Sequence, residues 1–168
     1  DDLCFDAQQA HDLFGRLGRL AGDDAARGPL GRGQDGDDLH FGAGSAHVAG
    51  VQAHVGQPDD VTALVARALE TYGRIDITVN NAATNPYFGD MLGADAGVWD
   101  KTFDVNLKGP FFITQKAIKL MIETNTKGSI VNISSVNGIK PAPFQGIYSI
   151  TKAGLITMTK AYAKEFAD

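Results

Sequence analysis

Residues 129–152 read SIVNISSVNGIKPAPFQGIYSITK, and this stretch determines how the rest of the chain is interpreted. The apolar run 129–133 is short enough for a buried parallel strand, and a turn-rich loop follows it. A helix is expected from about Tyr148, because the following residues keep helical spacing to the end of the chain. Tyr148 and Lys152 are four positions apart, so their side chains project from the same helical face.

The alternation of strand and helix continues outward from this stretch. In residues 59–72 the apolar side chains recur at helical spacing, with Asp59 as the expected N-cap and Gly73 as the expected end of the helix. Such alternation predicts an α/β fold with a doubly wound parallel sheet, whose ligands lie beyond the carboxyl ends of the strands. The other expected elements are strands at 48–55, 75–79 and 129–133 and helices at 98–123 and from about Tyr148 onward.

Three side chains in the central stretch suit proton transfer. A free tyrosine has a pKa of roughly 10, and a neighbouring ammonium favours the phenolate, so Lys152 is expected to prepare Tyr148 as an acid or base. Ser135 follows the strand, where its hydroxyl can hydrogen-bond a substrate oxygen and hold it near the phenol. The three residues therefore predict a site that handles a carbonyl or alcohol oxygen.

Tyr-x-x-x-Lys alone is common on solvated helices, but further motifs accompany it here. They are Asn80-Asn81-Ala82-Ala83 after a strand, Asn106 in the next helix, and Ile133-Ser134-Ser135 after the following strand. In this order and spacing, residues 48–168 resemble the short-chain dehydrogenase/reductase (SDR) family. The resemblance implies a Rossmann-like fold, NAD or NADP as cofactor, reversible oxidation of an alcohol to a ketone or aldehyde, and a homodimer or homotetramer.

The resemblance also implies individual roles. The family's serine lies thirteen positions before the tyrosine, which selects Ser135 over Ser134 for a catalytic set of Asn106, Ser135, Tyr148 and Lys152. Tyr148 and Lys152 would also bind the cofactor, with Lys152 at the nicotinamide ribose. The remaining cofactor-binding residues would be Asn81, Ala82 and Ala83 beside the adenosine half and His54 and Val55 near the adenine.

Two of these cofactor positions depart from the family's pattern. The family usually has Gly where Ala83 stands, and commonly Asp where this chain has His54, for which a surface or packing role stays open. His54-Val55-Gly56 and the loop 81–89 also resemble a carbonyl-reductase/retinol-dehydrogenase branch.

Pro110 adds a hypothesis about Asn106. In an uninterrupted α-helix the amide of residue 110 would bond the carbonyl of Asn106, but proline has no N–H. In the family that carbonyl binds a water that links the lysine to solvent. Pro110 would keep the carbonyl available for this relay, and a kink that serves packing alone is the equal alternative.

The glycine-rich phosphate turn of the family is missing from the sequence. Gly31-Arg32-Gly33-Gln34-Asp35-Gly36 matches G-x-G-x-x-G, but that motif functions between a strand and a helix, and no such context is expected here. The chain stops at Asp168, before the later parts of the family's fold. We therefore expect an incomplete Rossmann-like domain, unable by itself to turn over substrate.

Residues 1–47 differ in composition from residues 48–168. They contain no Val, Ile or Thr and are rich in Gly, Asp and Arg, so a buried strand is not expected there. The first Ile is Ile75 and the first Lys is Lys101. A disordered extension and an artefactual or out-of-frame N-terminus both remain open.

Charge and cysteine content exclude several classes of function. A net charge of −5 with scattered Lys and Arg gives no basic face for nucleic acid. The single cysteine, Cys4, excludes an internal disulfide framework and a multi-cysteine metal site, and no metal is expected. With no secretory signal and no long apolar run, a cytoplasmic protein with no membrane contact is predicted.

Two alternatives to the dehydrogenase remain at this stage. Nucleotide-sugar epimerases and dehydratases also carry Tyr-x-x-x-Lys and a bound dinucleotide. A non-catalytic fragment or pseudoenzyme of the same fold would explain the missing phosphate turn.

Overall fold

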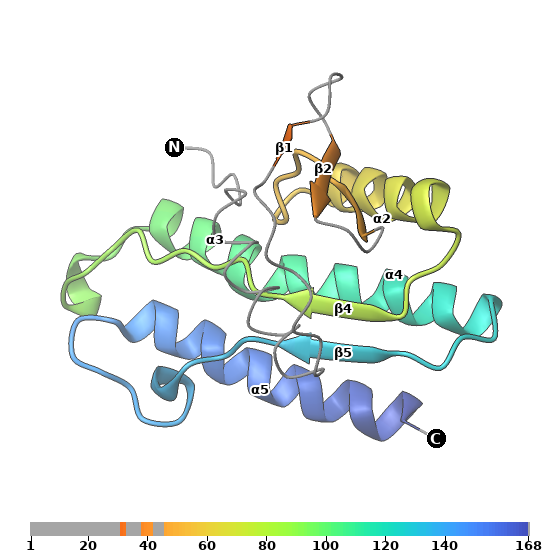
Figure 1. Ribbon diagram of the computed structural model, residues 1–168. Coiled ribbons are helices and arrows are strands. Elements are labelled where there is room, and N and C mark those ends of the chain that lie inside the picture. Colours follow the sequence, from red (N-terminus) through yellow and green to blue (C-terminus); the bar gives the residue numbers. More distant parts are fainter. Residues whose placement is uncertain (1–30, 33–37, 42–45, 168) are drawn as a thin grey trace. The chain divides into compact units, whose positions relative to one another are not determined.

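The computed structural model describes residues 31–32, 38–41 and 46–167 of the chain, which divides into two compact units, residues 1–52 and 53–168. In the first unit β1 (Gly31–Arg32), β2 (Asp38–Phe41) and β3 (Ala46–Ala49) form an antiparallel sheet in that order (Figure 1). Asp38 pairs with Ala49 and Phe41 with Ala46. The described residues after Gly31-Arg32 thus form a strand instead of the helix that a phosphate turn requires.

One expectation about this unit needs correction. The parallel strand expected at 48–55 is wrong, because β3 ends at Ala49, pairs antiparallel with β2, and is followed by irregular backbone. The proposal that residues 1–47 are disordered or artefactual concerns mainly residues that lie outside the described ones.

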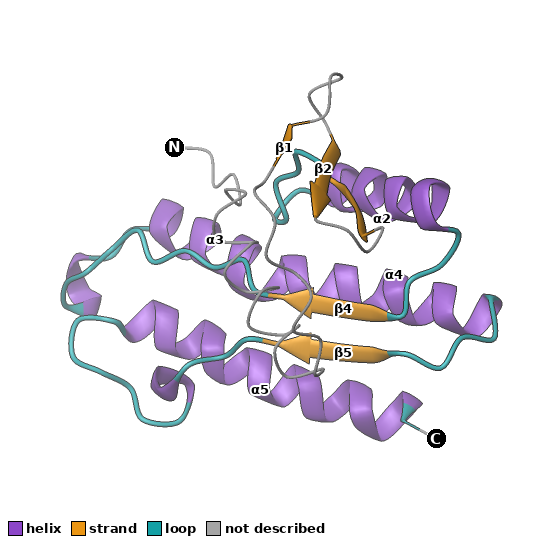
Figure 2. Cartoon of the chain, viewed as in Figure 1, coloured by secondary structure: helices purple, strands orange, loops and turns teal. Residues whose placement is uncertain are grey.

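The second unit contains the parallel strand pair and the helices that were expected around it. Its elements are α2 (Pro58–Tyr72), β4 (Ile77–Asn80), η1 (Met91–Gly93), α3 (Ala96–Phe103), the π-helical η2 (Asp104–Lys108), α4 (Gly109–Glu123), β5 (Ser129–Asn132), η3 (Val136–Gly138) and α5 (Gly146–Phe166). The strands β4 and β5 pair in parallel, from Ile77 opposite Ser129 to Asn80 opposite Asn132. In Figure 2 both arrows point toward the loops that lead to α3 and α5, so these loops meet at one end of the sheet.

Helix α2 ends as predicted but begins differently. Gly73 adopts the left-handed conformation with φ 74°, and its N–H bonds the carbonyl of Leu69. The N-cap is Gln57, with Pro58 in the first turn, so the expectation of Asp59 as N-cap is wrong. Proline is favoured at that position because its missing N–H would be unpaired there anyway, and Asp59 instead adds negative charge to the first turn.

The single helix expected at 98–123 is interrupted by the π-helical turn η2. There the Gly109 N–H bonds the carbonyl of Asp104, five residues earlier. Pro110 explains the interruption, because it cannot donate to the carbonyl four residues before it and its ring would collide with that carbonyl. One residue is therefore added to the turn, and α4 restarts at Gly109 with Pro110 in its first turn.

The core of the second unit is partly polar. Helices α4 and α5 pack against each other and against β4 and β5, respectively, and α2 packs against α4. Among the described residues, the buried side chains include Val61, Val105, Pro110, Ala117, Met121, Ile147 and Leu155 together with the polar Asn80, Thr102, Asn106, Thr114, Ser149, Thr151 and Lys152. Every buried polar side-chain atom in the described part has a hydrogen-bond partner, as low-dielectric surroundings demand.

Candidate active site

The predicted catalytic residues lie around the carboxyl ends of β4 and β5. Ser135 is the N-cap of η3 in the loop after β5, and Tyr148 and Lys152 lie in the first two turns of α5. The Lys152 Nζ lies 5.7 Å from the centroid of the Tyr148 ring. The phenol and the ammonium therefore lie next to each other on α5, as their spacing of four residues predicted.

Lys152 is held in place from both of its ends. Its side chain is 2% exposed, and its Nζ donates a 2.8 Å hydrogen bond to the carbonyl of Ile133. Its own main-chain carbonyl accepts a 2.9 Å bond from the Ser134 Oγ. Burial lowers the pKa of Lys152 below its ordinary value, because removal from water disfavours the charged form.

A glycine lets η3 approach α5 at this point. A Cβ on Gly138 would lie 2.8 Å from the main-chain carbonyl carbon and oxygen of Lys152. Any larger residue would push the Ser135 loop away from α5. The close approach of these two segments therefore depends on Gly138.

Ser135 has a defined hydrogen-bond geometry. Its backbone is extended, and its Oγ accepts a 3.2 Å bond from the N–H of Asn137. A serine hydroxyl that accepts in this way keeps its proton for a second partner. Ser135 can therefore donate to an oxygen placed next to it.

Asn106 ties the loop after β4 to α5. It is fully buried, its Oδ1 accepts a 2.7 Å bond from the N–H of Thr84, and its Nδ2 donates to the Thr84 carbonyl at 2.9 Å and to the Thr151 Oγ1 at 3.1 Å. The Thr151 hydroxyl in turn donates to the carbonyl of Tyr148 at 2.7 Å. This chain of bonds fixes the turn 80–84 relative to the helix that carries Tyr148.

Thr84 and Thr151 were not identified from the sequence. Thr151 lies between Tyr148 and Lys152, but nothing in the motif indicates that it faces inward to meet Asn106. A long-range contact of this kind leaves no periodic signal along the chain.

The Asn80–Ala83 turn combines a buried anchor with more accessible residues. The Asn80 Nδ2 donates to the Thr114 Oγ1 at 3.0 Å and to the Asn132 Oδ1 at 2.8 Å, which links β4 to α4 and to β5. Asn81, Ala82 and Ala83 follow it and are half-buried. They lie beyond the carboxyl end of β4, where sheets of this class bind their ligands.

His54 and Val55 occupy different surroundings. His54 is exposed, and its main-chain N–H donates a 2.8 Å bond to the Asp60 carboxylate. Val55 is half-buried against the start of α4, where a Cβ on Gly109 would lie 2.5 Å from the Val55 carbonyl oxygen. Gly109 is thus required for the contact between the two segments.

An aromatic pair joins the two loops at this end of the sheet. The rings of Phe88 and Phe144 lie 5.9 Å apart, and the Gly89 N–H donates to the Phe144 carbonyl at 3.1 Å. Phe144 has a φ of 64°, which is unusual for a bulky residue and is stabilised here by the loop-to-loop contact. The loops that carry Asn81 and Ser135 are therefore held together beyond the strands.

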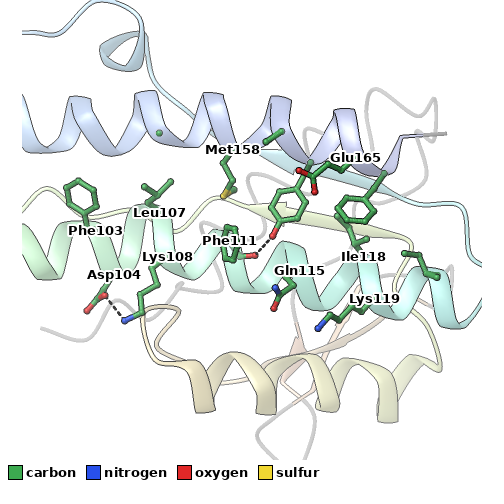
Figure 3. A pocket seen from close by; sticks show the side chains of 15 residues that line it. Phe103, Asp104, Leu107, Lys108, Phe111, Gln115, Ile118, Lys119, Met158 and Glu165 are labelled. Atoms are coloured by element: carbon green, nitrogen blue, oxygen red, sulfur yellow. Dashed lines mark hydrogen bonds and ion pairs between the residues drawn. The ribbon is translucent and has the colours of Figure 1, made fainter.

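A separate apolar groove runs between α4 and α5 and does not include any of the predicted catalytic residues. Figure 3 shows Phe103, Leu107, Phe111, Ile118 and Met158 around it. The groove has a volume of about 860 Å³, and charged side chains of both signs, Asp104, Lys108, Lys119 and Glu165, lie along it.

None of the helices in the described part of the chain has the length and apolar character needed to cross a bilayer. No group of three or more His, Cys, Asp or Glu side chains among the described residues is arranged to hold a metal ion.

Comparisons with known proteins agree with the motifs. A family model described as short chain dehydrogenase matches residues 39–168. "Dehydrogenase/reductase SDR family member 4" of Homo sapiens is 42% identical over 120 residues, which cover 71% of this chain and 43% of that protein. "Dehydrogenase/reductase SDR family member 2, mitochondrial" of Homo sapiens is 36% identical over 120 residues, 71% of this chain and 42% of that protein.

Solved structures give the same fold. ElxO with NADP bound superposes with a TM-score of 0.66 at 32% identity, over 70% of this chain and 47% of that chain. NAD+-bound xylitol dehydrogenase superposes with a TM-score of 0.66 at 26% identity, over 70% of this chain and 45% of that chain. The expected Rossmann-like fold is thereby confirmed, and the chain spans less than half the length of the relatives that it matches.

Proposed function

The chain belongs to the short-chain dehydrogenase family, and on that premise we propose that the full-length protein is an NAD(P)-dependent oxidoreductase that interconverts an alcohol and a ketone or aldehyde. The observation that carries this proposal is the arrangement of Tyr148 beside the buried Lys152, with Ser135 at the start of η3 close by in the fold. The activity belongs to the whole protein, because this chain covers 43% of its relative's length.

Tyr148 moves the proton in the proposed reaction. In the reducing direction its O–H donates a proton to the substrate's carbonyl oxygen, which becomes a hydroxyl; in the oxidising direction the phenolate takes that proton back. A nicotinamide dinucleotide held by these residues would supply the hydride for reduction and accept it in oxidation. Lys152 places its ammonium beside the reacting phenol, and Ser135 donates a hydrogen bond that holds the substrate oxygen in place.

The cofactor is proposed to be NAD or NADP, and the residues present fit part of such a dinucleotide. The half-buried turn Asn81–Ala83 lies beyond the carboxyl end of β4, where sheets of this class bind nucleotides. We assign this turn to the adenosine half, His54 and Val55 to the adenine, and Lys152 to the ribose beside the nicotinamide. Solved relatives with NADP and with NAD+ support either cofactor.

Asn106 is proposed to contribute through its main-chain carbonyl, which would bind the water of a proton relay to Lys152. Its side chain is fully engaged with Thr84 and Thr151, so only the main chain is left for such a role. The π-helical turn at residues 104–108 replaces the α-helical bonding in which that carbonyl would ordinarily take part.

The central experiment measures oxidation and reduction directly. The purified full-length protein, supplied with NADH or NADPH and a panel of ketones and aldehydes, is expected to consume the reduced cofactor, and the reverse reaction should occur with alcohols. Calorimetric titration with each cofactor measures binding independently. Cofactor binding without net turnover on any substrate would contradict the dehydrogenase and favour a pseudoenzyme or an epimerase.

A homo-oligomer is the second part of the proposal, with the groove between α4 and α5 as the contact surface. A two-fold axis places such a groove against itself, and its mixed charges avoid the repulsion that a patch of one sign would create. Phe111→Asp is expected to reduce self-association in sedimentation measurements and to leave the fold intact. A parent protein that is monomeric at all concentrations would contradict this contact.

A cytoplasmic location is the last part of the proposal. A single cysteine fits a reducing compartment, where disulfides are rare. Fractionation of the native cells would test it, and recovery of the protein from another compartment would contradict it.

A further inference from the structure

The loop between Ser135 and Tyr148 is closed by a side-chain bridge that the proposed mechanism does not use. The Asn137 Nδ2 donates a 2.9 Å hydrogen bond to the Gln145 Oε1. Asn137 lies two residues after Ser135 and Gln145 three residues before Tyr148, so the bridge joins the two ends of the loop that separates the catalytic pair.

Each end of this bridge is bonded to a catalytic segment. On one side the Asn137 N–H donates to the Ser135 Oγ at 3.2 Å. On the other side the Gln145 carbonyl accepts from the N–H of Ser149 at 2.9 Å and from its Oγ at 2.7 Å, in the first turn of α5. The bonds therefore run continuously from the Ser135 hydroxyl to the residue after Tyr148.

Apart from this bridge, the loop is held by short backbone turns and by the Phe144 contacts described above. Ile139 and Phe144 are largely exposed, at 80% and 55%, and Phe144 has the unfavourable positive φ noted above. Gln145 is the N-cap residue of α5, yet its side chain makes no capping bond and reaches across to Asn137 instead. A capping bond would stabilise only the start of α5, whereas the Gln145 side-chain amide instead links α5 to the segment after Ser135.

We propose that Asn137 and Gln145 are positioning residues that set the separation and orientation of Ser135 and Tyr148 for the substrate oxygen. This inference rests on the proposed dehydrogenase function. The bridge fixes the Asn137 N–H against the Ser135 Oγ, which leaves the serine proton directed at the substrate. Small displacements of reacting groups reduce rates strongly, so a loop of this length needs such a constraint.

Replacing one or both amides by a carboxylate tests whether the hydrogen bond between residues 137 and 145 is needed, because the shape of the side chains hardly changes. Asn137→Asp keeps an acceptor that a turned Gln145 amide can bond, and Gln145→Glu keeps the acceptor for the Asn137 amide. The combination of Asn137→Asp with Gln145→Glu places two carboxylates together and breaks the bridge with almost no change of shape. Gln52→Glu with Asn125→Asp adds the same charge elsewhere and serves as the control.

The variants are measured in the full-length protein at about pH 8. Each single variant should keep kcat within about threefold of the parent, while the double variant should lose about tenfold or more with little change in cofactor Kd. At about pH 5, where one of two adjacent carboxyls binds a proton and can bridge the other, the double variant should recover relative to the parent and to the control. If the double variant does not fold, Asn137→Ala replaces it in the test. Asn137→Ala should lose a comparable share of kcat and should not recover at about pH 5.

Hydrogen exchange gives a readout that needs no activity. The main-chain N–H of residue 137 should exchange faster in the double variant than in the parent at about pH 8. An unchanged exchange rate would overturn the bridge as a constraint. A double variant with parental kcat, or single variants as impaired as the double, would overturn the positioning role. A parent without any turnover would instead refute the proposed function, and the exchange measurement would still decide whether the bridge holds Asn137 in place.

Discussion

The two sides of α5 contrast sharply. Toward the sheet the helix buries polar groups, among them Lys152 and Thr151, each with a hydrogen-bond partner. Toward the groove it presents Met158, Tyr162 and Phe166, and a large apolar space is left open. The buried side of α5 therefore mixes these polar groups with the apolar Ile147 and Leu155, while the groove side is mainly apolar and open. Buried polar groups are costly, so their presence marks the side where chemistry is proposed, and the open apolar side marks a contact surface.

Each side of α5 also carries one titratable group whose pKa is shifted by burial. Burial lowers the pKa of Lys152, while burial and the nearby Glu165 raise the pKa of Tyr162 on the groove side. Tyr162 donates its O–H to the carbonyl of Phe111 at 3.2 Å. The two tyrosines of this helix, Tyr148 and Tyr162, therefore provide a matched pair for testing which side is catalytic.

The largest expected effect comes from Tyr148→Phe in the full-length protein. Loss of the transferable proton should reduce kcat by at least about a hundredfold and leave cofactor Kd nearly unchanged, because general acid–base catalysis contributes on this scale. Tyr162→Phe removes the same oxygen from the groove side and should keep turnover. Steady-state kinetics of both variants makes the comparison, and a Tyr148→Phe enzyme within a few-fold of the parent would end the catalytic assignment.

Lys152→Met should have the second largest effect, and it should change cofactor binding as well as kcat. Its loss removes both the charge beside the phenol and the proposed ribose contact, so kcat should fall and the cofactor Kd should rise by about tenfold. Lys160→Met, at an exposed position of the same helix, is the control. Calorimetric titration measures the Kd, and unaltered affinity would remove the ribose contact while leaving the charge effect intact.

A smaller effect is expected from Pro110→Ala, which asks whether the polar side of α5 is connected to solvent through Asn106. A restored N–H at residue 110 would allow the ordinary α-helical bond to the Asn106 carbonyl and would compete with a relay water. Turnover should fall by a few-fold, at about the scale of one hydrogen bond, with cofactor affinity preserved. Full turnover with an intact fold would mean that the π-helical turn serves packing alone.

The smallest effect concerns stability at alkaline pH. The folded-state pKa of Lys152 lies below its ordinary value of 10.5, so in the interval between the two values the unfolded chain binds more protons than the folded one. The destabilisation from the buried charge is complete below the folded pKa and disappears as the pH rises to 10.5. Chemical denaturation should therefore show a contribution that stabilises the parent with rising pH and is missing in Lys152→Met; parallel pH profiles for the two proteins would contradict it.

Much of the site was predictable because it is encoded in short-range spacing. Tyr148 and Lys152 share one side of a helix wherever that helix lies, and the short run at 129–133 gave β5 within one residue. Gly73 ends α2 as predicted, since only the local left-handed conformation is involved. The motifs also indicated the family correctly, because several short patterns in fixed order rarely coincide by chance.

Other features depended on contacts between distant segments. Asn106 meets Thr84 and Thr151, and Asn137 meets Gln145, through pairings that no periodicity along the chain records. The strand expected at 48–55 was replaced by the shorter β3 because strand pairing is decided by the available neighbour. The N-cap of α2 moved to Gln57 because the proline in its first turn suits a helix start.

The sequence by itself thus determined which side chains carry the proposed chemistry and on which helix they lie. Only the tertiary structure decided how they are held: Lys152 by the Ile133 carbonyl and Asn106 by the turn after β4. It also decided that α5 buries polar groups on one side and borders an open apolar groove on the other. The physical reason is the range of the interactions. Helical spacing and turn preferences act within a few residues, whereas buried hydrogen bonds and close backbone approaches exist only after distant segments have come together.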